Sequence, residues 1–324
     1  MNLAARASRA LVLLSLAGAA RPAAAFLRST TCADRPDAGY ALWWGSRSVT
    51  FRFSTARVPS GCADLPTAEA LVAQSFLTWN GATRTGDSAP CTDFAFVEGP
   101  ATPSFQVGVR DGENVVAFRQ GGCAAVAPAG DPCLTQGGCA NRYNCWEPGR
   151  SGGTLAITWV SFSTGSGQIT DADTELDDWD GTSGYLFTCG APGSPRCASS
   201  SNPTPPGCTW IDVGAVVTHE AGHALGLDHP CGGMGGCSPP SLMAPYIQQG
   251  STLRTLYPDD VEGMCTIYPA GQPTSRVKLP GSCGGSRGCG CGGGPASALW
   301  ALLPPLLLRR SRLRRSPPRS SRPR

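Results

Sequence analysis

The chain has 324 residues and a formal net charge of +3, and its 42 glycines and 29 prolines indicate a loop-rich fold. Only 15% of the residues are charged while 41% are hydrophobic, which excludes a disordered polyelectrolyte and allows a sizeable core. Eight arginines in 309–324 and three in 1–25 carry the positive excess, so the residues between these two ends have a net charge of −8. This negative net charge of the central residues excludes the basic surface that is typical of a nucleic-acid-binding protein.

The first 25 residues predict an export signal. Arg6 and Arg9 give a positive start, residues 11–20 form a short apolar run, and Ala23–Ala25 offer a small-residue cleavage site. An apolar run this short does not span a bilayer, so we expect cleavage near Phe26 rather than a membrane anchor. The sixteen cysteines agree, because disulfides persist in oxidising compartments. Both observations predict a secreted, extracellular protein.

Residues 26–269 are expected to form one α+β domain that is rich in loops and pinned by disulfides. Apolar–polar alternation and β-branched residues predict strands at Val49–Phe53, Asp93–Val97, Phe105–Val109, Asn114–Phe118, Thr154–Phe162 and Ile169–Leu176. Helical spacing predicts helices at Thr67–Trp79, with Thr67 as N-cap, at Val213–Leu225, with Asp212 as N-cap, and at Asp259–Ile267. Two segments without periodicity, 124–153 and 186–208, are expected to be disulfide-pinned loops.

After Pro269 the composition changes to a glycine- and cysteine-rich linker over 270–294, followed by a short apolar segment and an arginine-rich tail over 295–324. Residues 296–308 would span only about 20 Å as a helix, short of the ~30 Å core of a bilayer. Cysteines, an apolar stretch and arginines in this order resemble the myxobacterial C-terminal sorting tail. The resemblance implies transient membrane contact and anchoring at the cell surface.

The most informative segment is His219–His229, which reads H-E-x-x-H-x-x-G-x-x-H. On a helix, His219 and His223 lie on one face and can bind one metal ion. Gly226 permits a left-handed turn that ends the helix, so that His229 can supply a third ligand. Three neutral imidazoles leave one tetrahedral position open, as a catalytic zinc requires. These are the only histidines of the chain, which argues against three unrelated side chains.

This motif resembles that of the metzincin metallopeptidases, and within them the matrixins. Ser241–Pro245 resembles the family's Met-turn, in which Met243 would form a hydrophobic floor beneath the ligands. Residues 256–268 resemble the helix that closes the matrixin domain, and Thr154–Ala156 resemble its edge strand. The resemblance implies a twisted, mostly parallel sheet with one antiparallel edge strand, together with long helices.

The activity that the resemblance implies is that of a secreted or surface-held zinc endopeptidase. Glu220 would act as the general base on a zinc-bound water, and one zinc per chain is expected. Thr154, Leu155 and Ala156 would bind an extended peptide as an additional strand, with an S1′ pocket between the zinc helix and the segment after Met243. The partners expected are protein or peptide substrates, and the chain is expected to be a monomer. The alternative is a catalytically silent, zinc-bearing surface module that binds proteins.

Three further expectations concern cysteines and carboxylates. Cys32 is expected in a structural disulfide, although its surroundings weakly resemble the family's inhibitory cysteine. A disulfide between Cys231 and Cys237 would close the insertion after His229, while the sequence leaves the connectivity open. A third feature, an acidic run, offers either calcium ligands or a solvated turn, and the candidate ligands are Asp171, Asp173 and Glu175.

Overall fold

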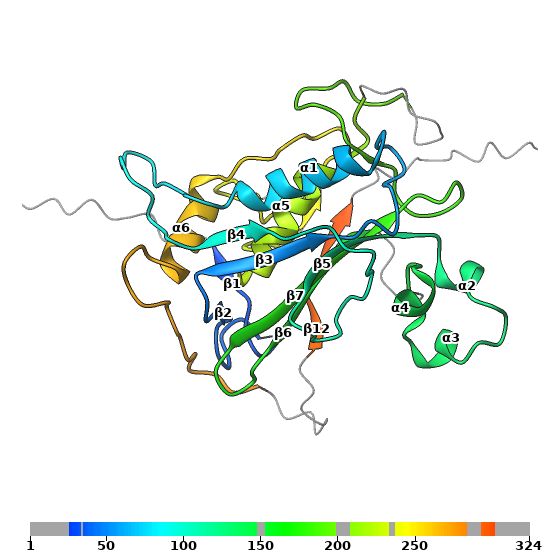
Figure 1. Cartoon of the computed structure of the whole chain (residues 1–324). Helices are drawn as coiled ribbons and strands as arrows, with labels where there is room; N and C mark the ends of the chain where they lie inside the picture. Colours follow the sequence, from blue (N-terminus) through cyan, green and yellow to red (C-terminus); the bar gives the residue numbers. More distant parts are fainter. Residues whose placement is uncertain are drawn as a thin grey trace, which may run out of the picture.

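A computed structural model describes residues 26–33, 35–147, 153–198, 208–232, 237–283 and 293–301, the last range by its backbone (Figure 1). The predicted export signal and the arginine-rich end lie outside these residues. Within the described part of the chain, no helix is both long enough and apolar enough to cross a membrane.

One twisted sheet forms the centre of the domain. Its strands are β2 (Trp43–Trp44), β3 (Ser48–Phe53), β4 (Ala95–Glu98), β5 (Asn114–Gln120), β6 (Thr154–Phe162), β7 (Gln168–Asp178), β11 (Tyr246–Ile247) and β12 (Gly293–Ala301). The spatial order is β11-β12-β6-β7-β5-β3-β4, and β2 pairs with β7. Strands β7, β5, β3 and β4 are mutually parallel, and β6 runs antiparallel to β7. The predicted mostly parallel sheet with an antiparallel strand is therefore confirmed.

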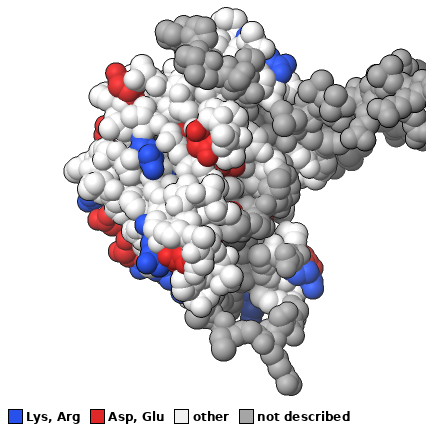
Figure 2. Space-filling model, turned by 90° about the vertical axis from the view of Figure 1, so that its right-hand side faces the viewer, with Lys and Arg blue, Asp and Glu red and all other residues white. Residues whose placement is uncertain are grey.

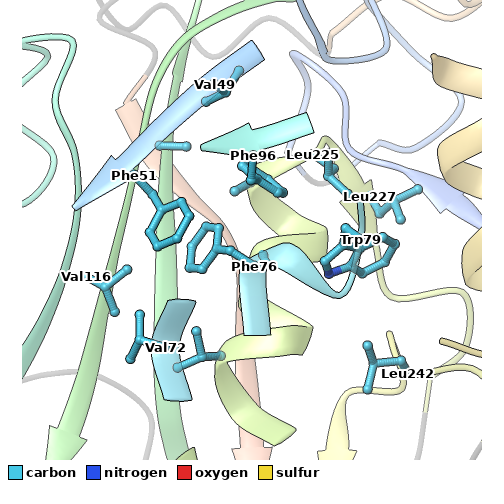
Figure 3. Packing of buried hydrophobic residues seen from close by; sticks show 14 of the residues in the cluster. Val49, Phe51, Val72, Phe76, Trp79, Phe96, Val116, Leu225, Leu227 and Leu242 are labelled. Carbon is cyan, nitrogen blue, oxygen red and sulfur yellow. The ribbon is translucent and has the colours of Figure 1, made fainter. Parts of the chain in front are cut away.

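Two long helices, α1 (Leu65–Leu77) and α5 (Val213–Ala224), pack against each other beside the sheet (Figure 1). Phe76 of α1 stacks on Phe51 of β3, with ring centroids 4.2 Å apart, and both belong to the main core (Figure 3). A third helix, α6 (Pro258–Ile267), closes the domain as predicted. Its buried face includes Met264 and Ile267. Burying such side chains contributes about 2 kcal/mol each, so this core fixes the positions of the helices.

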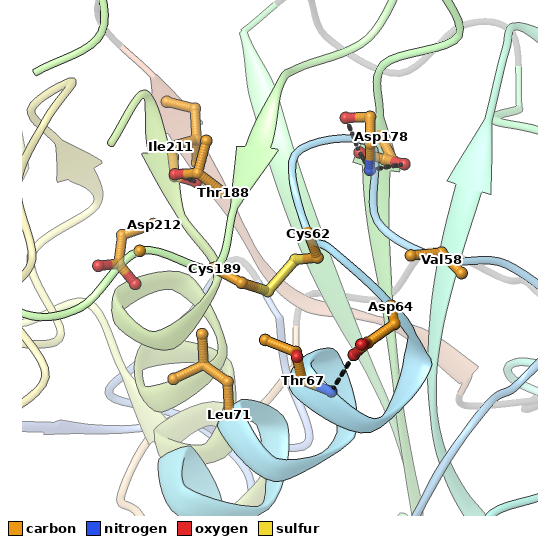
Figure 4. Close-up of a disulfide and its surroundings, with 12 residues drawn as sticks. Val58, Cys62, Asp64, Thr67, Leu71, Asp178, Thr188, Cys189, Ile211 and Asp212 are labelled. Carbon is orange, nitrogen blue, oxygen red and sulfur yellow. Dashed lines mark hydrogen bonds between the residues drawn. A yellow bond between two sulfur atoms is a disulfide. The ribbon is translucent and has the colours of Figure 1, made fainter. Parts of the chain in front are cut away.

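Two local expectations were wrong. Helix α1 begins earlier than predicted, because Asp64 rather than Thr67 is its N-cap: the Asp64 carboxylate accepts a hydrogen bond of 2.8 Å from the Thr67 backbone N–H (Figure 4). Residues 105–109 form no strand. The Val107 N–H donates a hydrogen bond of 3.0 Å to the Asn141 side-chain oxygen, and the Asn141 side-chain amide donates one of 2.8 Å to the Val107 carbonyl. These backbone groups are therefore not available to pair with a strand.

Seven disulfides use fourteen of the sixteen cysteines, and the other two cysteines lie outside the described residues. The predicted pair Cys231–Cys237 is confirmed, and Cys32 is in a disulfide, as expected. The bonds are Cys32–Cys283, Cys62–Cys189, Cys91–Cys265, Cys123–Cys145, Cys133–Cys139, Cys197–Cys208 and Cys231–Cys237. Figure 4 shows Cys62–Cys189, which joins the segment before α1 to that before β9 (Ile211–Asp212).

The two predicted pinned loops differ in their local structure. Residues 123–147, here called the cysteine-rich lobe, contain three short helices: α2 (Cys123–Val126), α3 (Cys133–Gln136) and α4 (Cys139–Tyr143). Two disulfides lie within this lobe, which projects from one end of the sheet (Figure 1). The second loop contributes a short strand, β8 (Phe187–Thr188), which pairs with β9.

The segment expected to be a linker begins as part of the folded unit. Tyr40 and Lys278 form an antiparallel bridge, and the Arg28 guanidinium donates to the Ser275 carbonyl at 3.0 Å. At Cys283, the end of this segment, a disulfide joins it to Cys32. Packing therefore continues beyond Pro269, the boundary that composition predicted. Further along, the start of the predicted apolar segment forms strand β12.

Candidate metal centre and peptide cleft

Helix α5 is held at its start by a buried ion pair. Asp212, the predicted cap, accepts a hydrogen bond of 3.0 Å from the Ala215 backbone N–H. The Arg254 guanidinium donates to the same carboxylate at 2.9 Å and packs on Gly214, where any side chain would collide with it. Because every residue of α5 is buried, the helix has one position in the core.

The end of α5 is fixed by two side chains that donate to its last carbonyls. The Trp44 indole N–H donates to Ala224 O at 2.7 Å, and the Tyr268 hydroxyl donates to Leu225 O at 2.8 Å. Gly226 then adopts a φ of +96°, in the left-handed region that favours glycine. The chain turns back into β10 (Leu227–Asp228), which pairs with β1 (Leu27–Arg28) and leads directly to the third histidine.

The three predicted metal ligands come together. The Nε2 atoms of His219, His223 and His229 lie 3.0, 3.1 and 3.2 Å from one another. The Nδ1 atoms of the first two lie 2.7 Å from Leu242 O and 2.9 Å from Leu227 O. A carbonyl can only accept, so each Nδ1 carries the proton and each Nε2 presents a lone pair to the common centre.

This arrangement of nitrogen atoms fits zinc. Tetrahedral zinc with Zn–N bonds of about 2.0–2.1 Å places its ligand nitrogens ~3.3–3.4 Å apart, close to the spacing found here. Burial lowers the pKa of His219 to about 4 and that of His229 to about 3, and it holds the pKa of His223 well below its usual range. The imidazoles are therefore neutral at pH 7, the form that binds a metal ion. Among the described residues, no other group of three potential ligands meets the same 4.8 Å spacing.

Glu220 lies next to the first ligand, and its two carboxylate oxygens have different surroundings. Oε2 accepts a hydrogen bond of 2.7 Å from the Thr158 hydroxyl of β6. Oε1 is buried and has no hydrogen-bond partner among the described residues. Burial raises the pKa of Glu220 to about 8, and a cation bound by the histidines would favour its charged form. One oxygen is therefore anchored, and the other is available to a reacting molecule.

Sequence reasoning did not identify Thr158. It lies two and four residues after Ala156 and Thr154, on the same face of β6 by strand alternation. Its hydroxyl lies 3.0 Å from the Thr174 hydroxyl of β7, which fixes it across the sheet. From the sequence, Thr158 could be recognised only as a threonine in a buried strand. The packing of α5 against β6 shows that its partner is Glu220.

Met243, the residue of the predicted Met-turn, packs against Gly222 of helix α5. A side chain at Gly222, between the first two ligands, would collide with the sulfur of Met243 and with the Trp79 ring. Met243 is 2% exposed and belongs to the main hydrophobic core. The close approach of helix and methionine therefore requires glycine at position 222.

Asp260 of α6 organises the segment around Met243, and sequence reasoning missed it as well. Its carboxylate accepts hydrogen bonds from the Ser241 hydroxyl at 2.6 Å and from the Leu242 N–H at 2.9 Å. It also accepts one from the Tyr257 N–H at 2.8 Å, at the start of α6. Since Leu242 O holds the Nδ1 of His219, Asp260 positions a metal ligand through the intervening backbone.

A cavity of about 270 Å³ lies beside the metal centre. His219 lines it on the helix side, and Leu242, Tyr246, Ile247 and Tyr257 line it on the other. It lies where the S1′ pocket was expected, between the zinc helix and the segment after Met243. The cavity has room for one large side chain or a small molecule.

Thr154, Leu155 and Ala156, the predicted substrate-binding residues, lie at the start of β6 and are buried. Within residues 26–283 their strand is the edge of the sheet next to α5. Strand β12 now covers this edge: Ala156 pairs with Leu299, and Thr154 pairs with Trp300. The edge strand predicted from the sequence is therefore present, and a segment of the same chain pairs with it.

The three candidate calcium ligands lie on one face of β7 and have protein partners. Asp173 accepts hydrogen bonds from the Gly108 and Val115 N–H groups at 2.7 and 2.8 Å, and Asp171 accepts one from Gly112 at 3.1 Å. Glu175 pairs with the buried Arg119 at 2.9 Å. These contacts hold the lobe and nearby loops to the sheet, and calcium binding stays a prediction.

The fold and the centre together define a metzincin-type domain: a long helix with two of the three histidines, a left-handed turn, and a methionine beneath the centre. Residues 149–269 match the sequence model of the matrixin family, which supports a matrixin-like metzincin fold for this part of the chain. Matrixins are zinc metallopeptidases. The matched range contains all three histidines, Glu220 and Met243. No curated protein matches the chain in sequence.

Proposed function

We propose that this protein is a zinc-dependent endopeptidase that hydrolyses peptide bonds in extended protein segments, with Glu220 as its general base. The observation that supports this most is that three converging histidine nitrogens and a buried carboxylate occur at the same site. Three Nε2 lone pairs converge on one centre, and Glu220, the residue beside the first ligand, has an Oε1 with no hydrogen-bond partner in the described part of the chain. A merely zinc-binding module needs the histidines but has no use for such a carboxylate.

His219, His223 and His229 would hold the zinc. Bound zinc would supply a Lewis acid that polarises a carbonyl and lowers the pKa of water from ~16 to around 7. The Nδ1 hydrogen bonds to Leu242 O and Leu227 O keep the first two rings in the required orientation.

Glu220 would move the proton of the reaction. Its Oε1 takes a proton from the attacking water and delivers it to the nitrogen of the departing amine. The Thr158 hydroxyl donates to Oε2, so the carboxylate stays oriented while its charge changes. Burial of the centre keeps bulk water from competing with the substrate for these groups.

The walls of the cleft would bind the main chain of the substrate. The edge of β6 offers backbone hydrogen bonds to an antiparallel strand, and β11 offers a second wall next to the cavity. Such pairing does not depend on the substrate's sequence, while the cavity of about 270 Å³ selects one side chain. Protein and peptide substrates are therefore the proposed partners.

We further propose that the protein works outside the cytoplasm as a monomer, exported by its first 25 residues and held at the cell surface through its C-terminal tail. Seven disulfides support the oxidising location. Figure 2 supports the exclusion of nucleic acid, because charged residues of both signs are scattered over the face that it shows.

Hydrolysis of casein by the purified, oxidised full chain tests the proposal. We expect activity that a zinc chelator abolishes and added zinc restores, and no activity in His223→Ala, which loses a ligand. Zinc bound without hydrolysis of casein or of a peptide library would instead support the silent binding module.

A further inference from the structure

Strand β12 lies in the cleft that a substrate would use. From Gly293 to Trp300 it pairs antiparallel with β6, and its last two residues, Trp300 and Ala301, pair in parallel with Tyr246 and Ile247 of β11. In the order of the sheet, β12 therefore lies between β11 and β6, and Figure 1 shows it beside β6. Strand β12 also contacts α5, the helix with two of the ligands.

The register places one part of β12 next to the reacting groups. Ser297 pairs with Thr158, whose hydroxyl holds Glu220. Trp300 pairs with Tyr246, which lines the cavity together with His219. The peptide bonds between Ala298 and Ala301 therefore lie between the Glu220 anchor on one wall and the cavity on the other.

The covalent tether favours this binding within one molecule. Cys283 is bound to Cys32, and only residues 284–292 connect it to Gly293. A short tether of this kind gives an effective concentration in the millimolar range, which exceeds that of any substrate in dilute solution. Main-chain pairing along β6 adds affinity that is independent of sequence.

We propose that the chain's own C-terminal segment is the first substrate of the site. The inference rests on the proposed peptidase function. Water adds across one peptide bond between Ala298 and Ala301: hydroxide joins the carbonyl carbon, the C–N bond breaks, and the nitrogen leaves as an amine with the remaining proton. The arginine-rich end is released as a free peptide. Until then β12 excludes other substrates from the cleft.

The intact mass of the full chain tests the proposal. The wild-type chain should lose its C-terminal end at one bond in 298–301, and Glu220→Gln should keep it. Because the reaction occurs within one molecule, its half-time should be unchanged over about a hundredfold dilution. A cut outside β12, or a rate proportional to protein concentration, would overturn the proposal.

A proline variant tests the pairing itself. Ala298→Pro removes a backbone N–H opposite Ile157, and it should slow self-cleavage at least about tenfold while added peptides are hydrolysed as fast or faster. Ser311→Pro, beyond β12, is the matched control and should cleave itself normally. If added peptides are hydrolysed but Ala298→Pro processes itself like the control, the proposal is wrong and the peptidase function stands.

A second readout does not need catalysis. In the Glu220→Gln background, adding Ala298→Pro should speed amide hydrogen exchange along Thr154–Phe162, and adding Ser311→Pro should not. Equal exchange in both variants would show that β12 does not cover β6, whatever the activity of the enzyme. If no substrate is hydrolysed under any condition, the proposed function itself fails.

Discussion

The metal centre and the cysteine-rich lobe are stabilised in different ways. Helix α5 and Met243 belong to the main hydrophobic core, and buried hydrogen bonds such as those of Asp260 connect their neighbours. The lobe has a separate small core of six residues, of which four are the disulfide-bonded Cys123, Cys133, Cys139 and Cys145. A region too small to bury much apolar surface needs covalent cross-links. The metal centre instead depends on packing in the main core and on buried hydrogen bonds.

Changes near the metal should therefore alter chemistry, and changes in the lobe should alter stability alone. The largest effect is expected for Glu220→Gln, which removes the proton carrier and keeps all three ligands. The rate of peptide hydrolysis should fall by about 10²–10⁴-fold. Metal analysis should still find one zinc per chain. Activity above a tenth of wild type would remove Glu220 from this role.

Asp260→Asn tests whether the metal centre depends on a residue that does not touch the metal. The neutral side chain holds the Leu242 N–H less strongly, so His219 is positioned less well, and zinc affinity should fall by about 10–100-fold. Competition with a chelator measures it. Glu262→Gln is the matched control on α6, because Glu262 pairs with Arg84 near the surface. Equal zinc affinity in the two variants would show that Asp260 does not position His219.

Thr158→Val separates the orientation of Glu220 from metal binding. Loss of the hydroxyl donor should lower kcat about tenfold, while the zinc content and KM change little. Thr158→Ser keeps a hydroxyl and should recover most of the activity. If serine and valine variants are equally impaired, the effect comes from packing, and the hydrogen bond does not orient Glu220.

The double variant Cys133→Ser/Cys139→Ser tests the lobe. This disulfide closes a short loop and lies in a core separate from that of α5, so its removal should cost about 2 kcal/mol of local stability. Hydrolysis of a short peptide should stay within about twofold of wild type, because the centre has its own core. A large loss of zinc in this variant would show that the two regions are not independent.

The smallest effect is expected for the pH dependence of stability. It concerns Asp173, which joins the sheet to the loops beside the lobe. Burial, with the neighbouring Asp171 carboxyl, raises the pKa of Asp173 from its ordinary 3.8 to about 8. The folded state therefore holds a proton more tightly than the unfolded state, so this contribution to stability is lost as the pH rises from about 4 to about 8.

Melting temperatures of the zinc-loaded protein at pH 5 and pH 8 measure this effect. Wild type should melt a few °C lower at pH 8, and Asp173→Asn should show a smaller difference. Added calcium should remove the difference if the predicted calcium site exists, because a dication favours ionised carboxylates. An unchanged pH dependence in the variant would assign the effect to other groups.

The sequence determined the parts of this protein that depend on local chemistry. Ligand spacing, helix periodicity and the glycine after the helix pointed to His219, His223, His229 and Glu220, and β-branched and aromatic residues predicted β6 over its full length. These signals are local because a helix and a strand repeat at fixed intervals.

Contacts between distant segments were decided by the tertiary structure alone. Thr158 and Asp260 act through partners far along the chain, and neither has a signature at its own position. The same holds for Cys283, whose disulfide partner is at the other end of the domain. The placement of β12 beside β6 also belongs here, because main-chain pairing leaves no pattern in side chains. Sequence thus specified the chemical groups, and packing specified what orients and covers them.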